Sequence, residues 1–202
     1  MRHYLESREP IESNMIEAKI TPGTCTTLQA KDWDNRTLAE LIQHIIAAHH
    51  QYLREEFPAL ETLLTHSSKG RSEPQTDSFA GLIKIFRQFR RGMEEHMKRE
   101  ESVLFPMIEK LESARAAGLA APRWPFGSIG RPIEMMEQEH DRARKELAEI
   151  RSLTSDYTSI PTMAAEQSST LDKLKALDGD MEVHSRLEDE ILFPRAIALE
   201  RI

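Results

Sequence analysis

Apolar residues recur every three or four positions in four long stretches of the chain, which is the spacing of one face of an α-helix. The first stretch begins at Thr37, where Thr37-Leu38-Ala39-Glu40 forms a capping-box pattern, and it continues to about residue 66. The other three cover about 78–114, 132–153 and 162–199. Segments rich in glycine, proline and serine separate them, and no stretch alternates as a strand does. The pattern therefore predicts an all-α protein.

Long helices joined by short loops are typical of antiparallel neighbours, so we expect an up-down-up-down four-helix bundle over residues 35–202. Residues 1–34 are expected to be a short N-terminal extension, which forms a short helix around 11–20 or drapes over the bundle. A proline inside a helix removes one hydrogen bond and clashes with the carbonyl four residues back. Bends are therefore predicted at Pro58, Pro106 and Pro194.

Composition excludes several classes of partner. Charged residues make up 30% of the 202 residues, the net charge is −7, and basic residues are interspersed with acidic ones, so we expect no nucleic-acid partner. No apolar run approaches the roughly 20 residues that a membrane-spanning helix needs. The N-terminus lacks an apolar secretion core, and we therefore expect no membrane partner and a cytoplasmic location. Cys25 is the single cysteine, which excludes an internal disulfide and a thiolate cluster within one chain.

One short string occurs twice, 88 residues apart. Residues 96–106 and 184–194 both read His-x-x-x-Glu, then an acidic residue, and end in Leu-Phe-Pro. Residues four apart share a helix face, so each copy can present an imidazole and a carboxylate to one interior point. Another histidine precedes each copy, His50 by 46 residues and His140 by 44. The chain therefore reads as two helical hairpins, each with one lone histidine and one His-x-x-x-Glu motif.

The repeat supplies four imidazoles and two carboxylates as candidate metal ligands: His50, His96, Glu100, His140, His184 and Glu188. This donor set suits two first-row transition ions and favours iron over calcium or magnesium. If both glutamates bridge, together with an oxo or hydroxo bridge, each ion has five ligands and one open position. Small diatomic ligands such as dioxygen or nitric oxide are expected there. Manganese accepts the same donors, and we favour iron.

Two assignments stay open at this point. One His-x-x-x-Glu motif alone is more often a surface ion pair than a metal site, so the metal interpretation depends on the matching second copy. His49 competes with His50, because the preceding apolar stripe can equally centre on it; His50 is preferred since its surroundings match those of His140. Arg54 and Arg144 follow the lone histidines by four residues, and they either hold carboxylates beside the ligands or lie in solvent.

These motifs resemble hemerythrin-like (HHE cation-binding) proteins, and more closely the bacterial di-iron proteins described as Repair of Iron Centres. The match runs from Asp32-Trp33 through both repeated motifs and Glu139-His140-Asp141, over about 165 residues. The resemblance implies a non-haem di-iron centre in a four-helix bundle, an association with nitrosative and oxidative stress, and roles in iron delivery to damaged iron–sulfur proteins or in nitric oxide reduction. That family usually carries a small domain with adjacent cysteines before the bundle, whereas residues 1–34 here hold Cys25 alone.

Two functional hypotheses follow. The first is a di-iron stress protein that reduces nitric oxide or supplies iron to an iron–sulfur client, and it leaves open whether the protein is an enzyme. The second is a non-enzymatic sensor or store of dioxygen or iron. Consumption of nitric oxide with formation of N2O favours the first, and reversible dioxygen binding without turnover favours the second. A helical interaction module with a vestigial site is the third reading.

Overall fold

The computed structural model describes residues 33, 35–67, 75–158 and 165–201, and in this part of the chain it forms four helical rods. The predicted extension over residues 1–34, with Cys25 and the possible short helix, lies outside the described residues apart from Trp33. The elements are α2 (Leu38–Ile45), η1 (Ile46–His50) and α3 (Gln51–Ser67) in the first rod; α4 (Gln75–Arg99), η2 (Glu100–Leu104) and α5 (Phe105–Ala116) in the second; α6 (Gly130–Leu153) in the third; and α7 (Ala165–Arg186), η3 (Leu187–Leu192) and α8 (Phe193–Arg201) in the fourth. The η elements are π-helical turns.

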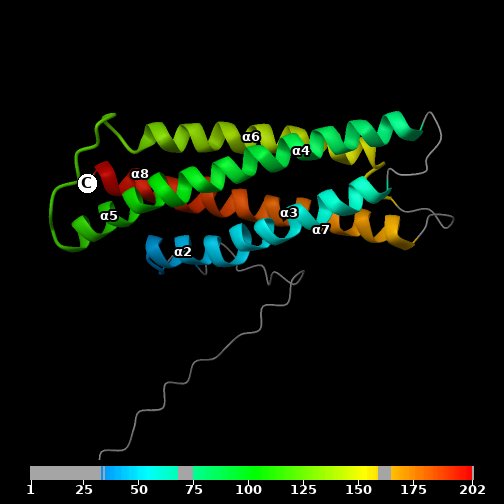
Figure 1. Ribbon diagram of the computed structural model, residues 1–202. Coiled ribbons are helices and arrows are strands. Elements are labelled where there is room, and N and C mark those ends of the chain that lie inside the picture. Colours follow the sequence, from blue (N-terminus) through cyan, green and yellow to red (C-terminus); the bar gives the residue numbers. More distant parts are fainter. Residues whose placement is uncertain (1–32, 34, 68–74, 159–164, 202) are drawn as a thin grey trace, which may run out of the picture.

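Successive rods run in opposite directions (Figure 1). α4 packs along α6 and α3 along α7, while α2 and α8 both pack against α5. Among the described residues no strand forms beyond one isolated bridge in the loop before α6. The predicted all-α, up-down-up-down four-helix bundle is confirmed. None of the helices in the described ranges is both long and apolar enough to cross a membrane.

Two apolar clusters fill the bundle, one toward each end. The first joins α2, α5, the start of α6 and α8 around Trp33, Phe105 and Phe193. The second joins α3, α4, α7 and the rest of α6 around Phe57, Phe86 and other buried residues. Buried histidines and glutamates belong to neither cluster. The core is therefore apolar at both ends and polar at the level of the predicted ligands.

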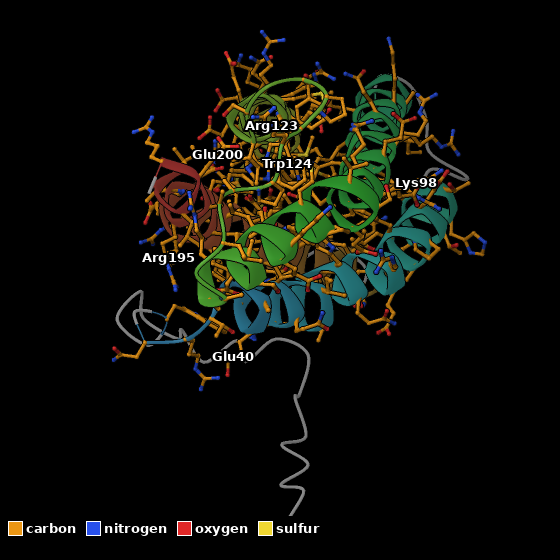
Figure 2. All side chains as sticks on the ribbon, turned by 90° about the vertical axis from the view of Figure 1, so that its left-hand side faces the viewer. Glu40, Lys98, Arg123, Trp124, Arg195 and Glu200 are labelled. Atoms are coloured by element: carbon orange, nitrogen blue, oxygen red, sulfur yellow. The ribbon has the colours of Figure 1, made fainter. Side chains whose placement is uncertain are left out.

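The repeat extends to the helix caps at one end of the bundle. Glu112 accepts hydrogen bonds from the backbone N–H groups of Leu38 (2.6 Å) and Ala39 (3.0 Å) at the start of α2. Glu200, 88 residues later, accepts from the N–H of Ile129 (2.9 Å) and from the Trp124 indole (3.0 Å) at the start of α6. Figure 2 looks onto this end and shows Glu200 beside Trp124. Each hairpin thus supplies the free N–H groups of its first helix with a carboxylate from its own second helix.

Two of the three prolines at which bends are predicted lie just after π-helical turns. In η2 the N–H of Phe105 bonds to the carbonyl of Glu100, five residues back, and η3 repeats this from Phe193 to Glu188. Pro106 and Pro194 follow directly and, lacking an N–H, supply no α-helical bond to the carbonyl four residues back. Pro58 lies inside α3, which runs from residue 51 to 67 without interruption.

Candidate metal centre

All six predicted ligands meet in the middle of the bundle, and every rod contributes at least one. Each of them is at most 1% exposed. Their ligand atoms form two groups, within each of which all atoms lie within 4.8 Å of one another. The first group is His50, Glu100, His184 and Glu188, and the second is His96, Glu100, His140 and Glu188. The two carboxylates are common to both groups, which suits two ions placed side by side.

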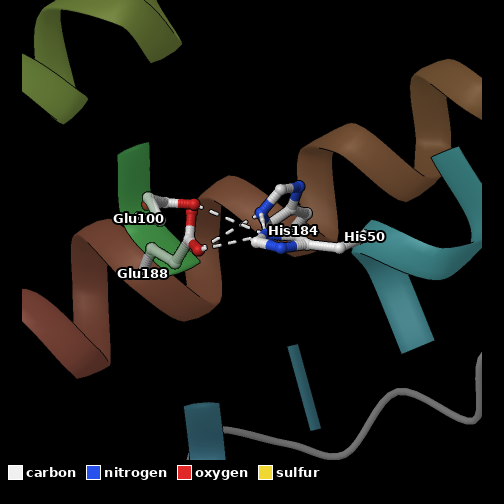
Figure 3. A group of neighbouring side chains, drawn as sticks. All are labelled: His50, Glu100, His184 and Glu188. Atoms are coloured by element: carbon white, nitrogen blue, oxygen red, sulfur yellow. Dashed lines mark hydrogen bonds and ion pairs between the residues drawn. The ribbon is translucent and has the colours of Figure 1, made fainter. Parts of the chain in front are cut away.

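The carboxylates face the imidazoles without hydrogen-bonding to them. In the first group (Figure 3) Nε2 of His50 lies 3.4 Å from Glu100, and Nε2 of His184 lies 3.2 Å from Glu188. In the second group His96 lies 3.3 Å from Glu100 in the same way. These are ion-pair distances, but all four carboxylate oxygens lack a hydrogen-bond donor among the described residues. Buried acceptors of this kind need a positive charge beside them, and a bound cation supplies it.

The imidazole nitrogens point to the same conclusion. Nδ1 of His96 lies 3.1 Å from Glu139 and Nδ1 of His140 lies 2.8 Å from Asp189, so each ring donates its Nδ1 proton to a carboxylate. In the neutral rings both Nε2 atoms then carry lone pairs, and they face each other at 3.0 Å. Two lone pairs at this distance repel unless a proton or a metal ion lies between them. The donor set therefore fits transition-metal ions.

Three carboxylates, which we call the outer carboxylates, stand behind the ligands: Glu101, Glu139 and Asp189. Glu101 lies 2.6 Å from Nδ1 of His50. Each outer carboxylate also contacts an arginine, and two of these arginines are Arg54 and Arg144. The sequence left open whether these two arginines hold carboxylates beside the ligands or lie in solvent. In the structure both contact such carboxylates, Arg54 at Glu101 and Arg144 at Asp189. The sequence analysis assigned no role to the individual outer carboxylates. Two of them could have been found from the repeat, because Glu101 and Asp189 directly follow the motif glutamates in the two copies.

The electrostatics of the centre favour positive charge. Burial opposes protonation of His96, yet the Glu100 carboxylate and other acidic neighbours raise its pKa to about 10. Burial is likewise outweighed at His140, whose pKa rises to about 9 through Asp189 and Glu188. The pKa of Glu188 lies well below its ordinary value despite burial, because His184 and His140 face it. His184 is the exception, since burial lowers its pKa.

The π-helical turn η1 explains why the apolar stripe did not separate His49 from His50. Buried residues at the start of the first rod keep a seven-residue spacing from Leu38 to Ile45, and the next interval, to Leu53, is eight. Because a π-helical turn inserts one residue into a helix, both histidines face the interior, and both are 0% exposed. The structure places His50 in the first ligand group and His49 outside both groups.

The repeated Leu-Phe-Pro strings place an aromatic ring against a ligand in each hairpin. Phe105 stacks on His50 with the ring centroids 5.8 Å apart and the planes 16° apart. Phe193 stacks on His140 at 6.2 Å and 11°. The two rings are 2% and 0% exposed, so they hold the imidazole planes from the apolar side and keep water from that face.

A four-helix bundle whose rods all contribute to a buried His/Glu centre is the architecture of a metal-binding helical protein. The family model described as "Hemerythrin HHE cation binding domain" matches residues 41–196, and the chain belongs to this family. Among curated relatives, the iron-sulfur cluster repair protein YtfE of Escherichia coli O81 (strain ED1a) is 31% identical over 194 residues, which cover 96% of this chain and 81% of the relative. The protein of the same name from Escherichia fergusonii is 30% identical over the same shares.

Proposed function

We propose that the six buried ligands bind two iron ions and that the protein acts in defence against nitrosative and oxidative stress. Each ion takes two imidazoles, and Glu100 and Glu188 serve both ions. The observation that carries the proposal is the pair of buried, donor-free carboxylates between four inward-facing imidazole nitrogens. Iron and manganese both accept these donors, and we prefer iron because the relatives are named for iron–sulfur cluster repair.

Enclosure of the centre limits what reaches it. Bound iron supplies a redox-active centre with positions for small ligands. The ligand side chains are at most 1% exposed, and Phe105 and Phe193 cover two of the imidazole faces. The chain's own residues would therefore hold the ions, fix the ring orientations and keep organic substrates away from the ligand side chains.

Iron supply to an iron–sulfur protein client is the activity we infer first, because the relatives that cover 96% of this chain are named for cluster repair. The test mixes the anaerobic, iron-loaded protein with an apo iron–sulfur protein, sulfide and thiol, and follows cluster formation by visible absorption. The control chains are Glu188→Gln, which removes a shared ligand charge, and Glu190→Gln, which changes an exposed carboxyl. Formation faster than with an equal amount of free ferrous ion supports the inference, and an equal rate contradicts it.

Binding and reduction of nitric oxide is the second candidate, and the enclosure of the centre favours it. A centre whose ligand side chains are at most 1% exposed suits small ligands such as nitric oxide or dioxygen better than an organic substrate. Iron-loaded protein with nitric oxide and a reductant is expected to form N2O, measured in the headspace gas. Reversible dioxygen binding with no N2O supports the alternative of a sensor or store.

A further inference from the structure

Three of the four ligand imidazoles share a support that the fourth lacks. Nδ1 of His50, His96 and His140 each contacts an outer carboxylate, which in turn contacts an arginine. Nδ1 of His184 has no hydrogen-bond partner anywhere in the described part of the chain. The second ligand group therefore has two supported imidazoles, and the first group has one.

His49 occupies the place where the internal repeat would put the missing carboxylate. Glu139, the partner of His96, stands directly before the ligand histidine of α6, and His49 stands directly before His50 in the first rod. The ring of His49 lies flat on that of His184, with centroids 5.5 Å apart and planes 9° apart. A hydrogen-bond partner of Nδ1 has to lie near the plane of the His184 ring, so a stacked ring cannot serve.

Asp180 holds His49 in this stacked position. Its Oδ1 lies 2.9 Å from Nδ1 of His49, and both side chains are largely buried. Asp180 stands four residues before His184, where the other copy of the repeat has Gly92. Asp180 thus orients the ring of His49 and not that of the ligand His184.

The arginine is replaced as well. Arg99 lies three residues after the motif histidine of α4 and contacts Glu139 at 2.6 Å, whereas the same place after His184 holds the apolar Leu187. A carboxylate on Nδ1 orients a ligand imidazole and increases its electron donation to the metal, and its loss lowers metal affinity roughly 10–100-fold. An ion in the first ligand group would therefore be held more weakly than one in the second.

We propose that the two ions leave in a fixed order, the ion held by His50 and His184 first, and that His49, oriented by Asp180, is the positioning residue that sets this order. The inference rests on the proposed two-ion centre. It describes an iron donor that gives up one ion readily and retains the other with His96 and His140.

The experiment challenges the full-length protein, loaded anaerobically with ferrous iron, with an excess of a coloured ferrous chelator. Two release phases of one ion each are expected, with rates that differ roughly 10–100-fold, the effect of one outer hydrogen-bond partner. A His184→Ala chain should lose the fast-released ion and keep the slow one, which assigns the fast phase to the first group.

Two matched variants move the phases in opposite directions. His49→Glu puts a carboxylate at position 49, which corresponds to Glu139 in the repeat, and Asp180→Asn removes the carboxylate that would otherwise repel it. This double variant should slow the fast release phase toward the rate of the slow one. Glu139→Gln removes the charge from His96's partner and should convert the slow phase into a fast one. Circular dichroism confirms that each variant is folded. If the double variant does not fold, the release rates of Glu139→Gln alone test whether a carboxylate at Nδ1 sets the order of release. Glu139 is only half-buried, so this substitution is compatible with folding.

A single release phase for both ions in the unaltered protein overturns the inference and leaves the two-ion proposal standing. Unchanged fast release in a folded double variant, or unchanged slow release in Glu139→Gln, also overturns it. Fewer than two ions bound per chain overturns the proposed centre and this inference together. A purely structural role of His49 would change stability without moving one phase selectively.

Discussion

Glu100 and Glu188 are the residues on which the centre depends most. Both are 0% exposed, both face imidazoles from two groups, and none of their oxygens has a donor in the described residues. Burial of such carboxylates is unfavourable unless positive charge lies beside them. Protons on the imidazoles or bound metal ions can supply that charge.

Glu188→Gln tests this dependence at the scale of one residue. The substitution keeps the size of the side chain and removes a charge that both ligand groups share, so bound iron should fall from two ions per chain to fewer than one. Glu190→Gln, two residues later and exposed, should keep both ions. Metal analysis after anaerobic loading and desalting gives the comparison, and two retained ions in Glu188→Gln would contradict the assignment.

At the scale of the elements, the π-helical turns decide where ligands point. η1 ends at His50, η2 begins at Glu100 and η3 contains Glu188. Each turn inserts a residue and rotates the helix beyond it, so the ligands of the second rod and the residues that follow the turn, such as Phe105, can both face the interior. Pro106 and Pro194 favour this geometry in two rods because they withhold an α-helical N–H.

Pro106→Ala is therefore expected to weaken metal binding. Alanine restores the N–H that an α-helical bond to the carbonyl of Ser102 needs, which favours a regular helix in place of η2 and so shifts Glu100 relative to Phe105 and to the ligands of the other rods. Pro58→Ala is the matched control, because Pro58 lies in α3 away from any π-helical turn. Iron titrations should show weaker binding for Pro106→Ala alone, with helix content by circular dichroism preserved in both. Equal affinities would show that the proline does not maintain η2.

The carboxylates that cap the helices support stability without touching the centre. Glu200→Ala removes the acceptor for the Ile129 N–H and the Trp124 indole, and it should lower the free energy of unfolding by about 0.5–2 kcal/mol, the usual effect of losing a helix cap. Urea unfolding of the metal-free protein measures this change. Iron content should stay at two ions per chain, and a loss of iron would show that the cap acts on the centre.

The sequence predicted the elements better than their irregularities. Apolar spacing and the repeat predicted four helices and brought together the six residues that the structure groups, because these signals depend on a helical period that holds over most of each rod. The burial of both His49 and His50 was not predicted, because the residue inserted by the π-helical turn η1 breaks the helical period there. The contacts of Glu139 and Asp180 escaped as well, because they join different rods or depend on the orientation of one ring.

At the scale of the whole molecule, the protein is two similar hairpins that meet at one polar layer. Correspondences 88 residues apart include the motif histidines, the motif glutamates and the capping carboxylates Glu112 and Glu200. The halves differ at one pair of equivalent positions, where the first hairpin has His49 and the second has Glu139. The two ligand groups are therefore alike in their ligands and unlike in their support.

The stability of the metal-free protein should depend on pH through this polar layer. The raised pKa values of His96 and His140 stabilise the fold fully below the ordinary imidazole value of 6.5, and this contribution is lost as pH rises toward 9 and 10. The lowered pKa of Glu188 stabilises the fold above its ordinary value of 4.5 and is lost as pH falls. The lowered pKa of His184 acts in the opposite sense and makes folding less favourable as pH falls below 6.5, so stability should be greatest toward the upper end of the range from about pH 4.5 to 6.5. Urea unfolding across pH tests this, and stability that rises from pH 6.5 to 9 would contradict it.

Mössbauer spectroscopy of the iron-loaded protein, combined with iron analysis, tests the central assignment most directly. The shared carboxylates of the two ligand groups predict two iron ions per chain that are magnetically coupled as one pair. Less than one iron per chain, or iron that behaves as isolated single ions, would contradict a two-ion centre built from these six residues.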